Sequence, residues 1–299
     1  MAVVIRNERL SLGITPDLGG SFTHFSLNSG DAWVDLMRPA LEGFTSSSDA
    51  SSFLMAPYPN RIRDGKFAFA GETYQLRFPE KHAIHGDVRN RPWKIEEASP
   101  TAISLSFHSP DFKDINYPFP FSIRQRCVVH DSSLHVSCCI TNEGTTAMPA
   151  GCGFHPYFNR ALSGHSEEVE IQFQAAGVYP FTGAVPLPDG MAKTLTPELA
   201  FSVQRVLPES LDHCFSGWQG RAVMTWPQSK VRLVMEASPN FGHLVLYSPP
   251  GKSFFALEPQ SQMNDGFNFF ARGEQGTGVV VLQPQERLEA WFSLRIEEV

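Results

Sequence analysis

The chain has 299 residues, of which 42% are hydrophobic and 18% charged, and its formal net charge is -7. This composition provides enough apolar residues for a core, and the acidic balance without a basic run argues against a nucleic-acid partner. No apolar run approaches the roughly 20 residues of a membrane helix, and the N-terminus has no signal-peptide pattern. The sequence therefore predicts a cytoplasmic protein that contacts no membrane.

Short runs of alternating, β-branched or aromatic residues recur along the chain, bounded by Gly, Pro, Asn and Asp, whereas helical periodicity is hard to find. HDSS at 130–133 and WPQSK at 226–230 resemble hairpin turns, which predicts antiparallel neighbours. The predicted strands are, in chain order, residues 2–5, 66–76, 102–108, 121–130, 134–141, 169–175, 222–226, 231–237, 243–247, 254–257, 278–283 and 289–296. We therefore expect an all-β fold.

Neither charge nor composition changes along the chain, and its 23 Gly and 23 Pro do not gather into a linker. One domain over residues 1–299 is the simplest account. The serine-rich stretch TSSSDASS at 45–52 is predicted to be a surface loop.

The cysteines form an odd set without a CxxC pair or zinc spacing. In a protein without a secretion signal this predicts buried free thiols. A nucleophile pair of Cys152 with the nearby His155 is the alternative. The five cysteines are Cys127, Cys138, Cys139, Cys152 and Cys214.

Four segments combine ionisable residues with Gly, Pro and aromatic residues, at positions 58–67, 82–93, 151–158 and 254–268. Such mixtures bind sugars, because aromatic rings cover the C–H faces while charged groups bind the hydroxyls. Glu258 follows the apolar run FFAL, so we expect its carboxylate at a strand end, partly desolvated, with the raised pKa of a useful base. His155, held between aromatic residues, is the candidate acid.

Several motifs appear in the order and at about the spacing of one known family. They are NRI at 60–62 with DGKF after it, IHG at 84–86, FHPYF at 154–158, LDHCF at 211–215, and LEPQ at 257–260 with NDGFN at 264–268. From about residue 55 to 290 the chain resembles the aldose 1-epimerases, or galactose mutarotases. The resemblance implies a large antiparallel β-sandwich, the galactose mutarotase-like supersandwich, and interconversion of the α and β anomers of a free aldose.

The family's residue roles carry over to matching positions. Glu258 would be the base that takes the proton from the C1 hydroxyl, and His155 would protonate the ring oxygen. Of the remaining matches, His85 would position or polarise the region near C1, while Asn60, Arg61 and Asp212 would bind the sugar. The resemblance implies no metal or other cofactor and no partner beyond the sugar, in a monomer or homodimer.

The chain departs from the family pattern at HGD, where the family usually has HGG, and the stretch after it is rich in arginine. A sugar phosphate bound by Arg89 and Arg91 is therefore an alternative substrate. His85 and Asp87, with His155, also match the ligands of a mononuclear iron site.

Two further alternatives concern the residues proposed for the sugar site. Glu258 and Asp212 could be the paired carboxylates of a glycosidase. A carbohydrate-binding protein of this fold could also have lost catalysis while keeping the aromatic residues.

Overall fold

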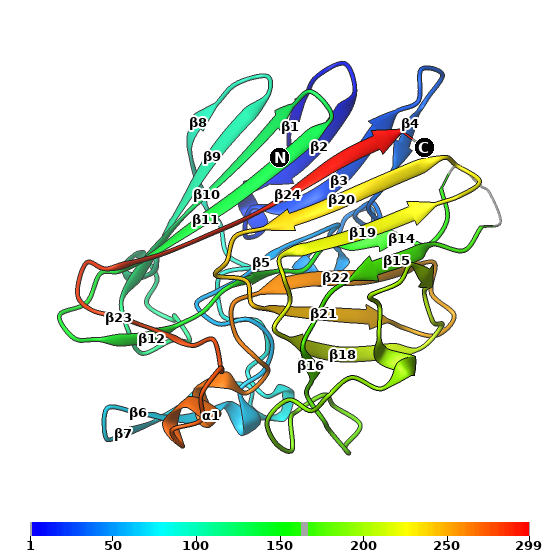
Figure 1. Cartoon of the computed structure of the whole chain (residues 1–299). Coiled ribbons are helices and arrows are strands. Elements are labelled where there is room, and N and C mark those ends of the chain that lie inside the picture. Colours follow the sequence, from blue (N-terminus) through cyan, green and yellow to red (C-terminus); the bar gives the residue numbers. More distant parts are fainter. Residues whose placement is uncertain (1, 163–166, 299) are drawn as a thin grey trace.

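The computed structural model describes residues 2–162 and 167–298, and Figure 1 shows two layers of antiparallel sheet with irregular segments below the second layer. The larger sheet has the strand order β17-β15-β19-β20-β24-β11-β10-β9-β8. Its strands are β8 (Lys94–Ala98), β9 (Ala102–His108), β10 (Phe121–His130), β11 (Ser133–Asn142), β15 (Glu170–Phe173), β17 (Arg205–Val206), β19 (Arg221–Trp226), β20 (Val231–Ala237) and β24 (Arg287–Glu298).

The opposing layer contains two sheets. One has the order β16-β18-β21-β22-β13-β5, with β14 also paired to β22, and the other has the order β1-β2-β3-β4. Their strands are β1 (Val3–Arg6), β2 (Leu10–Thr15), β3 (Ser21–Asn28), β4 (Trp33–Asp35), β5 (Leu54–Met55), β13 (Gly153–Phe154), β14 (Tyr157–Asn159), β16 (Gly177–Val178), β18 (Leu211–Ser216), β21 (His243–Ser248) and β22 (Phe254–Gln260).

The remaining elements are short. The hairpin of β6 (Lys66–Phe69) and β7 (Glu72–Gln75) lies near helix α1 (Gly266–Ala271), and β12 (Met148–Ala150) pairs with β23 (Val280–Leu282). Single 3₁₀ turns occupy residues 16–18, 47–49, 63–65, 79–81, 109–111 and 197–199. No helix within residues 2–162 and 167–298 is long and apolar enough to cross a membrane.

The two faces of β22 have different environments, and this positions the site. Phe255 and Leu257 belong to the main core between the layers. Since successive side chains of a strand point to opposite faces, Ala256, Glu258 and Gln260 face the other way, toward the irregular segments. The site is therefore on the outer face of the second layer.

The all-β prediction is confirmed, as are both predicted hairpin turns, since His130 pairs with Ser133 and Trp226 with Val231. The single strand predicted over residues 66–76 is wrong. It is two strands, because Ala70 and Gly71 have φ angles of 51° and 84° and form a tight turn.

Strand β2 was not predicted, although its sequence LSLGIT alternates apolar with polar or small residues; in the structure both of its faces are buried. The short strands next to the site and α1 also went unpredicted.

The loop predicted at residues 45–52 is present, with Thr45 and Ser48 exposed, but only part of it lies at the surface. Ser47, Ser51 and Ser52 are buried. The reason is that two arginine side chains, Arg38 and Arg89, donate hydrogen bonds into this segment and hold it against the body of the protein.

Glycine 86 allows a close approach that positions the loop around His85. Residues Ala56 and Gly86 form a parallel bridge, and a Cβ on Gly86 would lie 1.9 Å from the Ala56 carbonyl oxygen at a φ of +69°. Gly71 has a similar φ of +84° but open space around it. We expect Gly71→Ala to reduce the free energy of unfolding by about 1 kcal/mol and Gly86→Ala by about 3 kcal/mol or more. Urea titration of both variants measures the difference, and equal losses would contradict it.

Candidate active site

His155 lies between β13 and β14 and faces Glu258 of the neighbouring strand β22. Tyr157 of β14 pairs with Ala256 of β22 in an antiparallel ladder. When this register is continued by two residues, backwards from Tyr157 and forwards from Ala256, residue 155 lies opposite residue 258. His155 Nε2 lies 3.2 Å from Glu258 Oε1.

The sequence predicted Glu258 at the end of a strand, but the residue lies inside β22. The strand continues to Gln260 because β21 pairs with it as far as His243. The Glu258 side chain is only 3% exposed. Burial, with the nearby Asp212 charge, raises its pKa well above the usual value, and Arg61 opposes the shift. The predicted direction of the pKa shift is confirmed, although its cause is full burial.

His155 lies in an aromatic pocket. Its ring centroid is 4.8 Å from that of Phe53 and 4.4 Å from that of Tyr157. The ring of His85 meets it edge-on at 5.3 Å. Burial lowers the pKa of His155 to about 3, with further contributions from the positive charges of Arg89 and Arg38. The imidazole is therefore held rigidly in an environment that disfavours its charged form.

The opposite wall of the site comes from β18. Asp212 pairs there with Tyr247 of β21, and Tyr247 pairs in turn with Ala256, two residues before Glu258 on the same face of β22. Burial raises the pKa of Asp212 to about 6, and the positive charge of Arg61 opposes the shift. Two carboxyl groups with raised pKa values and one guanidinium therefore share this part of the site.

Asn60 and His85 come from irregular segments with left-handed backbone conformations. Their φ angles are 53° and 67°. The His85 amide donates a hydrogen bond of 2.7 Å to the Asn60 carbonyl, which joins the two segments. Burial lowers the pKa of His85, with contributions from Arg89, His155 and Arg61.

All six predicted site residues line one cavity of about 200 Å³. Four lining residues were not predicted as site residues: Ile84 belongs to the IHG motif, and strand pairing or loop packing brings Pro186, Val245 and Tyr247 there without a motif. The lining residues are Asn60, Arg61, Ile84, His85, His155, Pro186, Asp212, Val245, Tyr247 and Glu258.

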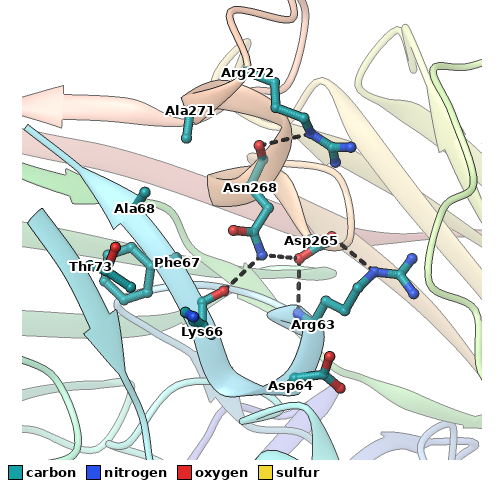
Figure 2. Close-up of a pocket in the computed structure, with 10 residues that line it drawn as sticks. All are labelled: Arg63, Asp64, Lys66, Phe67, Ala68, Thr73, Asp265, Asn268, Ala271 and Arg272. Carbon is teal, nitrogen blue, oxygen red and sulfur yellow. Dashed lines mark hydrogen bonds and ion pairs between the residues drawn. The ribbon is translucent and has the colours of Figure 1, made fainter. Parts of the chain in front are cut away.

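A buried aspartate next to α1 anchors the segment that carries Arg61. The Asp265 amide donates to the Arg61 carbonyl at 2.8 Å, and Asp265 Oδ1 accepts from the Arg63 amide at 2.8 Å. Figure 2 shows this carboxylate also accepting a bond from Asn268 at 2.7 Å. The NDGFN motif thus fixes the position of the NRI motif.

The cavity drawn in Figure 2 is larger, about 510 Å³, but contains none of the six predicted residues. Its buried carboxylate, Asp265, is already bound by Arg63 and Asn268. We therefore place the candidate site in the smaller cavity, where buried ionisable groups converge.

The iron-site alternative does not fit the geometry. The Asp87 carboxylate binds Arg91 at 2.8 Å, and Arg91 also binds Asp114 at 2.8 Å. Among the residues whose positions are described, no three His, Cys, Asp or Glu side chains gather as a metal site would require.

The surroundings of Cys152 do not support a nucleophile pair with His155. Cys127, Cys138, Cys152 and Cys214 are buried free thiols, as predicted, whereas Cys139 is partly exposed. Cys152 Sγ lies within the core, 3.7 Å from Cys138 Sγ.

Comparison with known proteins gives consistent results. A family model described as aldose 1-epimerase matches residues 1–295. The protein YphB of Escherichia coli K12 is 28% identical over 279 residues, which cover 89% of this chain and 91% of YphB. The crystal structure of a putative aldose 1-epimerase from Escherichia coli K12 superposes with a TM-score of 0.86 at 25% identity, covering 100% of this chain and 99% of that one.

A galactose mutarotase-like protein from Clostridium acetobutylicum has a TM-score of 0.85 at 19% identity, with coverage of 100% of this chain and 95% of that one. This likeness concerns the fold, which is therefore a galactose mutarotase-like β-sandwich. Because the family model spans nearly the whole sequence, the chain belongs to the aldose 1-epimerase family.

Proposed function

We propose that this protein is an aldose 1-epimerase that interconverts the α and β anomers of an aldose with a free C1 hydroxyl. The observation that carries the proposal is the contact of 3.2 Å between His155 Nε2 and Glu258 Oε1 in the cavity. Opening a sugar ring needs proton removal at O1 and proton delivery at the ring oxygen. One carboxylate and one imidazolium side by side supply both.

Unpaired polar atoms around the cavity support a ligand rich in hydroxyl groups. Glu258 Oε2, His85 Nδ1, Asn60 Oδ1 and Arg61 Nε are buried, and none has a hydrogen-bond partner within the described part of the chain. Buried polar groups are normally paired, and leaving one unpaired costs about 1–3 kcal/mol. A bound sugar offers donors and acceptors to all four atoms.

The proposed reaction needs one proton on the pair. When His155 holds it, Glu258 is the base and His155 the acid. Glu258 takes the proton from the C1 hydroxyl while His155 gives its proton to the ring oxygen, the C1–O5 bond breaks and the aldehyde forms. Rotation about C1–C2 and reclosure, with the roles reversed, gives the other anomer.

The remaining site residues are proposed to hold the sugar. Arg61 and Asp212 act on its hydroxyls through charge-assisted hydrogen bonds, and Asn60 supplies a neutral acceptor. His85, which burial keeps neutral, positions the region near C1. These positions orient C1 toward Glu258.

The main prediction concerns Glu258→Gln, a change of charge with little change of shape. Because general-base catalysis contributes about 10²- to 10⁴-fold, we expect the rate of mutarotation to fall by about that factor. Polarimetry of freshly dissolved α-D-glucose and α-D-galactose measures the rate. A rate that the substitution leaves unchanged would point to a carbohydrate-binding protein, and release of sugar from an aryl glycoside would point to a glycosidase.

Stability provides the control for this variant. The raised pKa of Glu258 means that the folded state retains a proton that the unfolded state loses, so wild-type stability falls as pH rises above the unfolded value. Glutamine has no such charge to bury. We expect the free energy of unfolding of Glu258→Gln to exceed that of the wild type at pH 7.5 and to show no such gain at pH 4. A variant less stable at pH 7.5 would show that lost activity reflects misfolding.

Asp212 gives the proposed reaction a pH dependence. Its pKa of about 6 means that it gains a proton as pH falls through 6 and then binds hydroxyls less strongly. We expect KM to rise below pH 6 in the wild type, and Asp212→Asn to have a raised KM without this rise. Steady-state rates between pH 5 and 8 test this, and a rise near pH 6 that persists in Asp212→Asn would assign it to another group.

A further inference from the structure

Two arginines beside the candidate site stack on its aromatic residues. The Arg89 guanidinium lies 4.9 Å from the ring centroid of Phe53, and the Arg38 guanidinium 3.9 Å from that of Tyr157. Both rings contact the imidazole of His155. The two positive charges therefore flank the proposed acid.

Both arginines bind the same residue. Arg89 Nη1 donates to the Ser48 hydroxyl at 2.8 Å, and Arg38 Nη2 donates to the Ser48 carbonyl at 2.8 Å. Arg38 also donates to the Ala50 carbonyl and Arg89 to the Ser47 hydroxyl, both in the same segment. The segment at 45–52 thus brings the guanidiniums together.

Neither guanidinium is neutralised by an ion pair. Among the described residues, no carboxylate forms an ion pair with Arg38 or Arg89, and the one carboxylate that influences the pKa of Arg38 is Asp49. Arg38 Nε is buried and has no partner in this part of the chain. Like charges held close together in a partly desolvated place repel each other and favour an anion between them.

The proposed chemistry fixes which part of a sugar lies nearest to these arginines. His155 gives its proton to the ring oxygen, and the ring carbon on the other side of that oxygen from C1 carries the exocyclic carbon. A substituent on that carbon is therefore close to His155, on the side away from C1.

We propose that the substrate is an aldose with an anionic group on its exocyclic carbon, a phosphate or a carboxylate, which Arg38 and Arg89 bind. The proposal rests on the proposed epimerase function. Arg89 also lines a second cavity of about 230 Å³, which shares Ile84 with the cavity of the candidate site and is also lined by Lys81 and Asp87. Two forked guanidinium groups suit the planar or tetrahedral oxygens of such an anion.

This assignment differs from the arginine pair suggested by the sequence. Arg91 is paired with Asp87 and Asp114, so its charge is already balanced. Arg38, which lies far from the arginine-rich stretch in sequence, takes its place. The hydrogen bonds that Arg38 and Arg89 both donate to Ser48 are the observation that pairs these two arginines.

A bound anion also assists the proposed acid. Burial lowers the pKa of His155, and the charges of Arg89 and Arg38 lower it further. An anion on these arginines offsets their repulsion of an imidazolium. A charged substrate thus promotes the protonation of His155 that its own ring opening needs.

The test compares α-D-glucose with D-glucose 6-phosphate and D-glucuronate, which differ at the exocyclic carbon. Anomer exchange is measured by NMR at pH 7.5, with the spontaneous rate of each sugar subtracted, for the wild type, Arg38→Gln and Arg89→Gln. Arg91→Gln is the matched control, because it removes a neutralised arginine from the same loop as Arg89. Arg89→Lys keeps the charge without the fork.

We expect kcat/KM of the wild type for at least one anionic sugar to exceed that for glucose by about tenfold or more, and the faster of the two identifies phosphate or carboxylate. Arg38→Gln and Arg89→Gln should each lower this ratio by about 10- to 100-fold. Arg89→Lys should retain part of the ratio, and Arg91→Gln most of it.

A ratio near one in the wild type, or equal losses on all three sugars, would overturn the anion site and leave the arginines as clamps of segment 45–52. Either result would leave the epimerase function intact. Failure to accelerate any of the three sugars would instead overturn the proposed function, and the anion site with it.

Discussion

The candidate site depends on the antiparallel register that puts His155 opposite Glu258. Cross-strand neighbours are about 5 Å apart, so a carboxyl group and an imidazole can meet at 3.2 Å without a special loop. A shift of one residue would turn Glu258 into the core and Leu257 toward the cavity. The core side chains of β22 therefore also hold the proposed base in place.

Burial has opposite effects on stability and on the proposed chemistry. It raises the pKa of Glu258 and lowers that of His155, so both resist their charged forms. Such an arrangement costs stability in the free protein. The two shifts also reverse the usual order of the two proton affinities, so the shared proton favours Glu258 over His155 in the free protein.

The irregular segments complete the site through backbone bonds. The amides of His85 and Asp265 donate to the carbonyls of Asn60 and Arg61. These bonds link three of the motifs recognised in the sequence, so their side chains approach the cavity as one unit. The segment at 45–52 does the same for Arg38 and Arg89 on the other side.

The sequence by itself determined the β class, the two hairpin turns, the family and the six candidate residues that line the cavity, because periodicity, turn chemistry and motif order can all be read along the chain. Only the tertiary structure decided the length of β22, the burial of Glu258 and the pairing of Arg91. It also decided the convergence of Arg38 with Arg89 on Ser48. These features depend on which strands pair and which loops pack together, and contacts between residues far apart in the chain leave no local pattern.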